Sequence, residues 1–576
     1  MRKLLVYLRP YRLQAILAPC FKLLEAAFEL LVPLIMADII DVGISSGDTA
    51  YILKKCLVLV GLGLCGFASA TCAQYFSAKA ATGATGRLRH ALFAHIQSLS
   101  YAELDRLGTA TLVTRMTSDM NQVQTGLNLT LRLLLRSPIV VFGAMLMAFT
   151  IDVKSALIFA VAIPVLFAVV FAIMLSCIPL YRRVQTRLDG VTGAAQENLS
   201  GVRVIRAFTR EQTETESFAE KTGDLFSAQQ FVGKLSALLN PLTYVIINLA
   251  IVAILRVGGV RVNEGVITQG QLIALYNYMS QILVELIKFA NLILNITKSV
   301  ACAGRISQVL DTKSSMVSGA SALPDSAEAP ELEFRHVSFR YPQAGADALT
   351  DISFCAAPGE TIGVIGGTGS GKSTLANLIP RFYDATAGCV LVRGEDVKSL
   401  RLQALRTRIG IVPQKALLFS GTIRENLRWG SADASDEALW DALRAAQADG
   451  VVRDKKGQLD AEVEPGGRNF SGGQRQRLTI ARALVRKPEL LILDDSASAL
   501  DFTTDAALRK ALARLPWKPT VVLISQRVSS IRHADKIVVL DDGRMAGLGT
   551  HAELKNTCPV YQEICRSQEK GEASAS

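Results

Sequence analysis

Long apolar runs dominate the first half of the chain, and they constrain its fold more than any other feature. A helix that crosses the hydrocarbon core of a bilayer needs about 20 predominantly apolar residues. Six stretches qualify: residues 13–42, 57–76, 133–150, 155–180, 238–260 and 271–297. The sequence therefore predicts a multidomain membrane protein that begins with a six-helix α-helical transmembrane domain. Disordered, collagen-like and small disulfide-stapled proteins are excluded, because 50% of the residues are apolar.

The segments after the second and fourth runs are long and polar. Each holds about 50 helix-patterned residues with almost no proline, so we expect the helices to continue beyond the bilayer as long cytoplasmic helical hairpins. An extension of about 25 residues would protrude by roughly 35 to 40 Å. Basic residues at the ends of the apolar runs mark this side as cytoplasmic. They are Arg87, Arg89, Arg106, Arg115, Arg132, Arg136, Arg182, Arg183 and Arg187.

The net charge of +11 and the ten cysteines do not indicate another class of protein. The basic residues adjoin apolar runs and form no patch interleaved with aromatic residues, so we expect no nucleic-acid binding. The cysteines include no CxxC pair, and several lie inside apolar runs, which is typical of reduced structural thiols.

Several ionisable residues fall inside the predicted spans, where a charge is costly unless it is paired, faces a cavity or reaches the interface. Lys22 and Glu25, like Glu285 and Lys288, have the i, i+3 spacing at which helix neighbours pair. Glu29 has no such local partner, so we expect it to face a cavity or a second subunit. Asp38 belongs to the same group of costly charges, and these residues specify no ligand.

The boundaries follow from composition. Residues 1–311 form the predicted transmembrane domain, which opens with a short basic interfacial helix rather than a cleaved leader. Residues 312–330 are rich in Ser, Ala and Pro without an apolar period, which is typical of a linker. Residues 331–565 have the pattern of a soluble α/β domain, and residues 566–576 are expected to be a disordered tail.

A phosphate-binding motif opens the second half. A short apolar strand, residues 361–365, is followed by GGTGSGKST and a helical pattern, which is the GxxxxGK[ST] P-loop in its required context. Its backbone N–H groups and the helix N-terminus are expected to cradle phosphates. The candidate ATP-binding residues are Gly366, Gly367, Thr368, Gly369, Ser370, Gly371, Lys372, Ser373 and Thr374. Lys372 would reach the β and γ phosphates, while the Ser373 hydroxyl would bind Mg²⁺.

A second apolar strand, residues 490–495, ends in two acids. A strand that ends in acids is more often a solvated edge than a metal site, but downstream of a P-loop the first acid, Asp494, fits the Mg²⁺ ligand of such NTPases.

The third motif, FSGGQRQRLTIARAL at residues 470–484, could by itself be a glycine-containing N-cap. With the other motifs it resembles the LSGGQ signature of ATP-binding cassette (ABC) ATPases. In that family the signature residues, here Ser471, Gly472, Gly473 and Gln474, bind the ATP held by a partner's P-loop. The resemblance covers residues 332–554. It implies an α/β P-loop ABC nucleotide-binding domain.

The resemblance assigns further roles. Tyr341 in FRYP is similar to the aromatic residue that stacks on adenine, and Gln414 in IVPQ to the Q-loop glutamine, a catalytic residue and Mg²⁺ ligand. Residues 498–501 (SALD) resemble the D-loop, and Glu462 the loop that precedes the signature in exporters. Segments 108–123 and 197–211 resemble exporter coupling helices, for which the alternative is ordinary solvated turns.

Two positions depart from the family pattern. Asp495 stands where active cassettes have a glutamate that polarises the attacking water, and its carboxylate would be withdrawn by about 1 to 1.5 Å. Gln526 stands where the family has a switch histidine, and glutamine cannot become cationic. This pattern resembles the degenerate-site subunit of heterodimeric bacterial ABC exporters of the multidrug-resistance type. It implies a site that binds ATP but hydrolyses it slowly.

The resemblance therefore implies half of an ATP-driven exporter in the plasma membrane, with its ATPase domain in the cytoplasm and ATP and Mg²⁺ as cofactors. Its partner would be a second half-transporter with an intact glutamate and histidine, and its solute a hydrophobic or amphipathic drug, lipid or peptide. Two alternatives stay open: a catalytically active homodimeric exporter, and an ATP-sensing membrane subunit that transports nothing. The identities of the solute and of the partner are not encoded in any pattern of the sequence.

Overall fold

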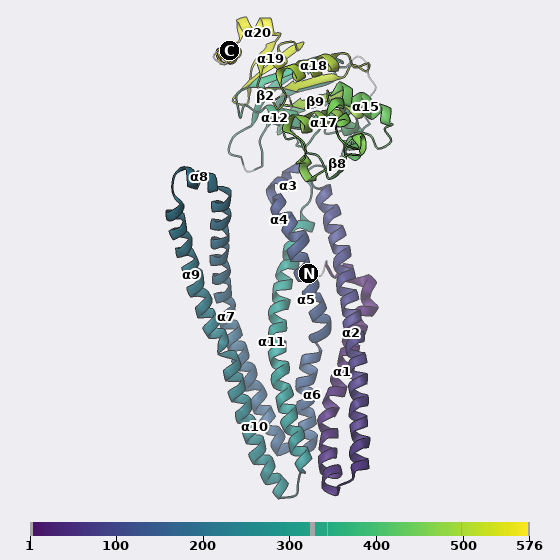
Figure 1. The fold of residues 1–576 in the computed structure, drawn as a ribbon, viewed down its shortest axis with the longest axis vertical. Helices are drawn as coiled ribbons and strands as arrows, with labels where there is room; N and C mark the ends of the chain where they lie inside the picture. The colour runs from purple at the N-terminus through teal and green to yellow at the C-terminus, as the bar shows by residue number, and fades with distance from the viewer. Residues whose placement is uncertain (1–3, 323–328, 343, 497, 574–576) are drawn as a thin grey trace. The chain divides into compact units, whose positions relative to one another are not determined.

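The computed structural model describes residues 4–322, 329–342, 344–496 and 498–573 (Figure 1). It divides into two compact units. The first comprises residues 1–97 and 110–312, and the second comprises residues 98–109 and 313–576. The second unit thus includes a short piece of the first half of the chain.

The first unit is entirely helical. A 3-10 helix, η1 (Leu4–Tyr11), lies where the interfacial helix was predicted. The other elements are α1 (Arg12–Asp38), η2 (Ile39–Ile44), α2 (Thr49–Ser98), α4 (Thr109–Thr114), η3 (Arg115–Asp119), α5 (Met120–Leu133), α6 (Arg136–Ile151), α7 (Val153–Ser200), α8 (Val202–Ala207), α9 (Glu211–Ala237), α10 (Leu239–Asn263) and α11 (Gln269–Asp311). With 50 residues and a rise of 1.5 Å each, α2 is about 75 Å long, well over twice the thickness of a bilayer core.

Among the described residues, five helical stretches are long and apolar enough to cross a membrane: Thr49–Ser98, Thr109–Ile151, Val153–Ser200, Glu211–Asn263 and Gln269–Asp311. They contain five of the six predicted spans. The remaining predicted span coincides with α1 and η2, whose apolar run is interrupted by Lys22, Glu25 and Glu29. That α1 crosses the bilayer therefore stays a prediction.

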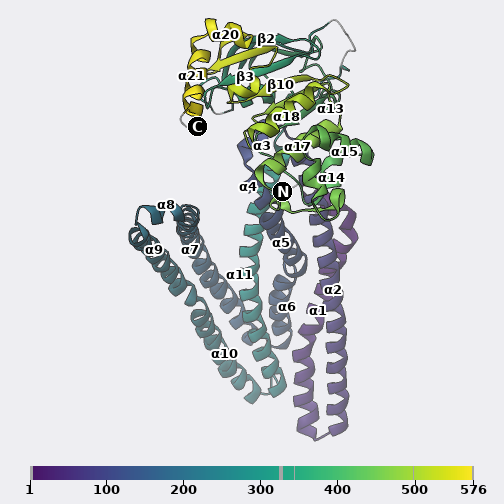
Figure 2. The same cartoon turned by 45° about the horizontal axis from the view of Figure 1, so that its top comes forward.

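Two groups of helices form the first unit. One group is α1, α2, α5, α6 and α11; the other is the hairpin in which α7 packs against α9 and α10, with α8 at its tip (Figures 1 and 2). Small side chains such as Ala144, Ala148 and Ala274 allow α6, α7 and α11 to approach closely around a common apolar core. The predicted coupling segment 197–211 contains α8 and therefore lies at the end of this hairpin.

The six ionisable residues named above inside the predicted spans are each paired within the chain. The predicted pairs Lys22–Glu25 (2.5 Å) and Lys288–Glu285 (2.9 Å) are confirmed. Glu29 bonds Arg136 of α6 at 2.6 Å, but its side chain stays 40% exposed, so that it faces a cavity or a second subunit remains a prediction. Arg136 also bonds Glu285 of α11 at 2.5 Å. The sequence counted Arg136 among the basic residues that flank apolar runs on the cytoplasmic side. The structure leaves it only 6% exposed, and the two carboxylates from α1 and α11 compensate its desolvation.

Replacing Arg136 with methionine is expected to lower the free energy of unfolding by roughly 3 kcal/mol, because Glu285 would stay buried without its guanidinium partner. This is the low end of the usual range, since Lys288 would still bond Glu285. The measurement is denaturant unfolding in detergent micelles. Arg444→Met, which removes an exposed pair with Asp441, is the matched control and should cost less than about 1 kcal/mol. Equal losses in both variants would contradict the assigned role of Arg136.

The second unit is built on three sheets. A six-stranded sheet of order β12-β11-β3-β10-β9-β6 is parallel except for its edge strand β12, and the four-stranded sheet β2-β1-β4-β5 is antiparallel. Strands β7 and β8 form a small separate pair. The strands are β1 (Leu332–Phe339), β2 (Leu349–Ala356), β3 (Thr361–Gly366), β4 (Ala387–Val392), β5 (Glu395–Asp396), β6 (Ile409–Val412), β7 (Gly421–Thr422), β8 (Glu462–Val463), β9 (Leu490–Asp494), β10 (Thr520–Ile524), β11 (Lys536–Asp541) and β12 (Arg544–Gly549).

Helices surround these sheets. They are α3 (Tyr101–Leu107), α12 (Lys372–Leu378), α13 (Leu402–Arg408), α14 (Ile423–Arg428), α15 (Asp436–Ala445), α16 (Asp449–Arg453), α17 (Gly472–Val485), α18 (Phe502–Ala513), α19 (Val528–Ile531), α20 (His551–Thr557) and α21 (Pro559–Ala573), with the 3-10 turns η4 (Gln458–Asp460) and η5 (Pro465–Gly467). Strands β3, β9 and β10 are almost fully buried, and their near-continuous apolar sequences are typical of parallel strands covered on both faces.

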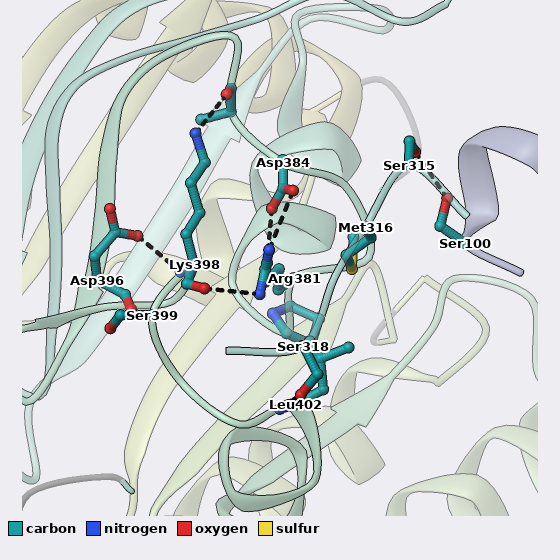
Figure 3. A network of polar contacts seen from close by, with 12 residues as sticks. Ser100, Ser315, Met316, Ser318, Arg381, Asp384, Asp396, Lys398, Ser399 and Leu402 are labelled. Carbon is teal, nitrogen blue, oxygen red and sulfur yellow. Dashed lines mark hydrogen bonds and ion pairs between the residues drawn. The ribbon is translucent and has the colours of Figure 1, made fainter. Parts of the chain in front are cut away.

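The described part of the predicted linker is residues 312–322 and 329–330, and residues 313–322 belong to the second unit. Its backbone pairs with residues 399–401: Gly319 N–H donates to the Leu400 carbonyl at 3.1 Å, and Arg401 N–H donates to the Ser321 carbonyl at 2.9 Å. Figure 3 shows this segment beside the Arg381–Asp384 ion pair and the loop that holds Lys398. Residues 323–328 of the predicted linker lie outside the described part of the chain.

The predicted disordered tail is helical over most of its length. Residues 566–573 continue helix α21, and residues 574–576 lie outside the described residues. Tyr561 and Cys565 of the same helix are buried against the core of the unit, which gives α21 the tertiary anchor that its polar end lacks.

Candidate nucleotide-binding site

The predicted P-loop connects β3 to α12 as expected. Gly369 and Gly371 have φ angles of +84° and +95°, a region that favours glycine. A Cβ atom on Gly371 would lie 2.7 Å from the Ala348 carbonyl oxygen, so a side chain there would also clash with a neighbouring strand. Gly367, Thr368 and Gly369 are exposed, and they form the open rim of an anion cradle at the N-terminus of α12.

Lys372 is folded into this cradle. Its Nζ donates to the carbonyl oxygens of Gly366 (3.0 Å) and Gly367 (2.5 Å), and to the Ser370 hydroxyl at 3.4 Å. Burial lowers the pKa of Lys372, although the carboxylates of Asp494 and Asp495 act in the opposite direction. Neutral carbonyls are weaker partners for an ammonium group than phosphate oxygens are, so the loop holds Lys372 in place for an anionic ligand.

The predicted metal ligands lie together. The Ser373 hydroxyl donates to Asp494 Oδ1 at 3.1 Å, and Asp494 ends the buried strand β9. Burial raises the pKa of Asp494, a cost that a bound cation would offset. One carboxylate, one hydroxyl and phosphate oxygens are a donor set that suits Mg²⁺, which usually takes few protein ligands. These side chains therefore fit the cation that accompanies ATP.

Asp495 and Gln414 meet at the same edge of the sheet. Gln414 Nε2 lies 3.4 Å from Asp495 Oδ2, and Asp495 is 9% exposed. The backbone of Asp495 has a φ of +46°, a region in which aspartate is enriched over most other residues. Its position is fixed by a bond from its N–H to the Ile524 carbonyl and by one from the Ser498 hydroxyl to its own carbonyl.

Gln526 lies in the loop after β10, where its side chain is exposed. The structure adds a residue that the sequence did not point to. Gln568 of α21 donates from Nε2 to the Gln526 carbonyl at 2.6 Å, and its Oε1 accepts from the Val528 N–H at 2.8 Å. Because Gln568 is distant in sequence and lies in the predicted tail, no local pattern marks it.

Tyr341 contacts the P-loop helix. Its hydroxyl lies 3.1 Å from the Thr374 hydroxyl, and its ring packs edge to face against Phe339 and Tyr383 at centroid distances of 4.8 and 5.3 Å. The aromatic neighbours hold Tyr341 beside the P-loop, where an adenine ring could stack on it.

The signature residues form a capping box at the start of α17. Ser471 accepts from the Gln474 N–H at 3.3 Å, and the Gln474 side chain accepts from the Ser471 N–H at 3.0 Å. Gly473 lies against the D-loop, since a Cβ there would be 3.0 Å from the Ala499 carbonyl, whereas Gly472 faces open space. Glu462 lies in β8, and its carbonyl accepts from Asn469 Nδ2 at 2.8 Å.

Helix α3 is a further element that no sequence pattern pointed to. It precedes the predicted coupling segment 108–123, whose own residues form α4, η3 and the start of α5, and it belongs to the second unit. The Tyr101 ring lies 4.6 Å from that of Phe382, and the Tyr383 hydroxyl donates to Asp105 at 2.5 Å. Tyr383 therefore touches both α3 and Tyr341, which connects this helix to the nucleotide-binding edge.

Comparison with known proteins identifies the family. A family model described as the ABC transporter transmembrane region matches residues 15–286, and one described as ABC transporter matches residues 349–498. An uncharacterized ABC transporter ATP-binding protein of Mycobacterium tuberculosis is 38% identical over 98% of this chain and 97% of its own length. The chain belongs to the ABC transporter family.

Two further comparisons extend this result. The relative YfiB of Bacillus subtilis is 36% identical over the full length of both chains. A solved structure of a bacterial Atm1-family ABC exporter with ATP bound superposes with a TM-score of 0.82 at 24% identity, over 97% of this chain and 99% of that one, which shows a common fold. The chain is therefore a multi-span ABC transporter of the plasma membrane with a cytoplasmic ATP-binding domain.

Lys372→Ala is expected to weaken nucleotide binding at least tenfold, because one charge-assisted bond to phosphate contributes about 1.5 to 3 kcal/mol. Binding of a fluorescent ATP analogue to the full-length protein measures this loss. Lys456→Ala is the matched control, since Lys456 is exposed and outside the cradle, and its affinity should be unchanged. An unchanged affinity of Lys372→Ala would contradict the assignment of the cradle.

Proposed function

We propose that this chain is the degenerate-site half of a heterodimeric ABC exporter. Its own P-loop binds ATP and hydrolyses it slowly, while its signature completes the active site of a different half-transporter. ATP binding closes the two cassettes, hydrolysis at the partner's site reopens them, and the transmembrane domain alternates its access.

The observation that carries this proposal is the geometry around Asp495. Its carboxylate lies 3.4 Å from Gln414 Nε2, and its backbone, directly after the end of β9, is held by the bond from its N–H to the Ile524 carbonyl. The aspartate side chain is one methylene shorter than a glutamate would be. A displacement near 1 Å from the attacking water can lower a rate on the order of 100-fold.

Gln526 supports the same conclusion by its chemistry. A glutamine at this position can donate one neutral hydrogen bond to a γ-phosphate, whereas a histidine can carry a positive charge. Charge that develops on the phosphoryl group would therefore be less stabilised. The bond of Ser373 to Asp494 and the capping box of the signature support a site that still binds ATP, so in this proposal both departures affect hydrolysis.

Two observations support a partner. The chain has one membrane region and one ATPase domain. The resemblance of its signature to that of ABC ATPases implies that each ATP is bound between two cassettes, so such a chain pairs with another ABC subunit. In addition, two relatives of this length, YfiB and YfiC at 36% and 32% identity, are encoded by the same Bacillus subtilis strain. Two different half-transporters can therefore coexist in one cell, as a heterodimer requires.

For the solute we propose a hydrophobic or amphipathic compound. A relative from Yersinia pestis, 29% identical over 98% of this chain, is an ATP-dependent lipid A-core flippase. The described part of the transmembrane unit carries many apolar side chains, and its buried charges neutralise one another. These two observations support a solute with a large apolar portion.

The first test restores the two altered side chains. Asp495→Glu combined with Gln526→His is expected to raise ATP turnover of the chain purified alone by about 10- to 100-fold. The control is the same double variant with Lys372→Ala, which should lose the gain. Brisk, Lys372-dependent turnover by the unmodified chain alone would instead favour the active homodimer.

The second test targets the signature. A Cβ on Gly472 meets nothing within 4 Å, so Gly472→Glu should fold normally. Its carboxylate would repel the partner's nucleotide, and turnover by the co-purified heterodimer is expected to fall at least tenfold while ATP binding at this chain's own P-loop persists. Gly450→Glu, also free of close contacts, is the control. A fall confined to own-site binding would contradict the shared-site arrangement.

Transport separates an exporter from an ATP-sensing subunit. Inverted membrane vesicles that contain both chains should accumulate an amphipathic dye in the presence of ATP, and vesicles with the Gly472→Glu variant should not. Nucleotide binding without accumulation of any solute would favour the sensor.

A further inference from the structure

A cleft separate from the nucleotide site lies beside helix α18. It has a volume of about 620 Å³, within the range of small-molecule sites. Its wall is formed by α18, by β9 and β10, by the turn before β3 and by residues 530–535 (α18 and β10 are labelled in Figure 2). None of the P-loop or signature residues lines it.

The floor of this cleft is apolar. Leu493, Leu508 and Leu523 line it and are each at most 6% exposed. Ala506 and Ala513 on the same helix are small, so α18 leaves space above the sheet where longer side chains would fill it. A flat apolar body, such as a fused aromatic ring or an acyl chain, suits such a floor.

The mouth of the cleft is cationic. Four cations, Arg509, Lys510, Lys518 and Arg532, line it together with His533. The two carboxylates that line it, those of Asp505 and Asp535, are already bonded within the protein. Asp505 accepts from the Ser530 hydroxyl at 3.1 Å and pairs with Arg509 at 3.3 Å, and Asp535 accepts from the Thr361 N–H at 2.8 Å.

Two observations indicate that the positive charge and the polar groups of the wall are not fully satisfied. Burial together with Arg532, Arg509 and His551 lowers the pKa of His533, as expected in a positive local field. Two polar atoms in the wall, Ser496 Oγ and Arg509 Nε, are buried without a hydrogen-bond partner among the described residues. Buried polar atoms rarely remain unpaired, so they favour a polar ligand or a bound water nearby.

We propose that this cleft binds an amphipathic organic anion, with its apolar body on the leucine floor and its carboxylate or phosphate at the cationic mouth. Because Ser496 directly follows Asp495, and Ser530 lies just beyond the loop of Gln526, a ligand here would sit behind the strand ends that carry the hydrolytic residues. The cleft is therefore a second small-molecule site of the ATPase domain.

Fluorine NMR tests this proposal on the full-length protein in lipid nanodiscs. The probe is a fluoronaphthoate, and its neutral counterpart, a fluoronaphthamide, controls for adsorption to lipid and to apolar surfaces. Saturable line broadening is expected for the naphthoate, with at least tenfold weaker binding of the naphthamide. Equal binding of the two probes, or no saturable broadening, would overturn the proposal.

Variants locate the site. Ala506→Leu fills the cleft and should remove the saturable broadening, whereas Lys518→Gln should weaken binding about threefold to tenfold. Arg514→Gln, on a neighbouring exposed residue outside the cleft, should leave it unchanged. Binding of a fluorescent ATP analogue verifies that each variant is folded. If Ala506→Leu does not fold, the result for Lys518→Gln decides the test. Unchanged naphthoate affinity in the folded variants would overturn the proposal.

Discussion

The structure of the first unit depends on one constraint, the absence of water from the hydrocarbon core of a membrane. Backbone groups must bond within each helix, and a charge must find a partner inside the protein. Arg136 satisfies this constraint between Glu29 and Glu285, and so joins α1, α6 and α11. Charges that would each be costly to desolvate in lipid thus form ion pairs between helices that are far apart in the sequence.

In the second unit the corresponding constraint is the binding of a highly charged anion. The P-loop backbone, Lys372 and the N-terminus of α12 converge at the carboxyl ends of parallel strands, where Asp494 ends β9 and Asp495 directly follows it. Two lateral contacts reach this edge. Tyr383 links it to α3, and Gln568 holds the loop of Gln526 from the C-terminal helix. Both contacts connect the nucleotide-binding edge to helices that carry none of the predicted ATP-binding residues.

The proposed cleft beside α18 extends this arrangement. Ser496 follows the acidic end of β9. Asp505 on α18 accepts a hydrogen bond from Ser530, which follows the loop of Gln526. The nucleotide edge and the cleft therefore share the segments that leave β9 and β10.

The sequence alone determined the features that depend on short-range pattern. Six apolar runs, the P-loop, the acidic strand and the signature were all predictable, because each is one contiguous segment with a fixed local geometry. The local pairs Lys22–Glu25 and Glu285–Lys288 were predictable for the same reason. Only the tertiary structure decided that Arg136 is buried against Glu29 and that α3 packs on Tyr383. It also decided that the polar end of the chain forms a helix, from which Gln568 donates a hydrogen bond to the loop of Gln526. These contacts join residues separated by tens to hundreds of positions, and their stability comes from desolvation and packing that exist only once the chain has folded.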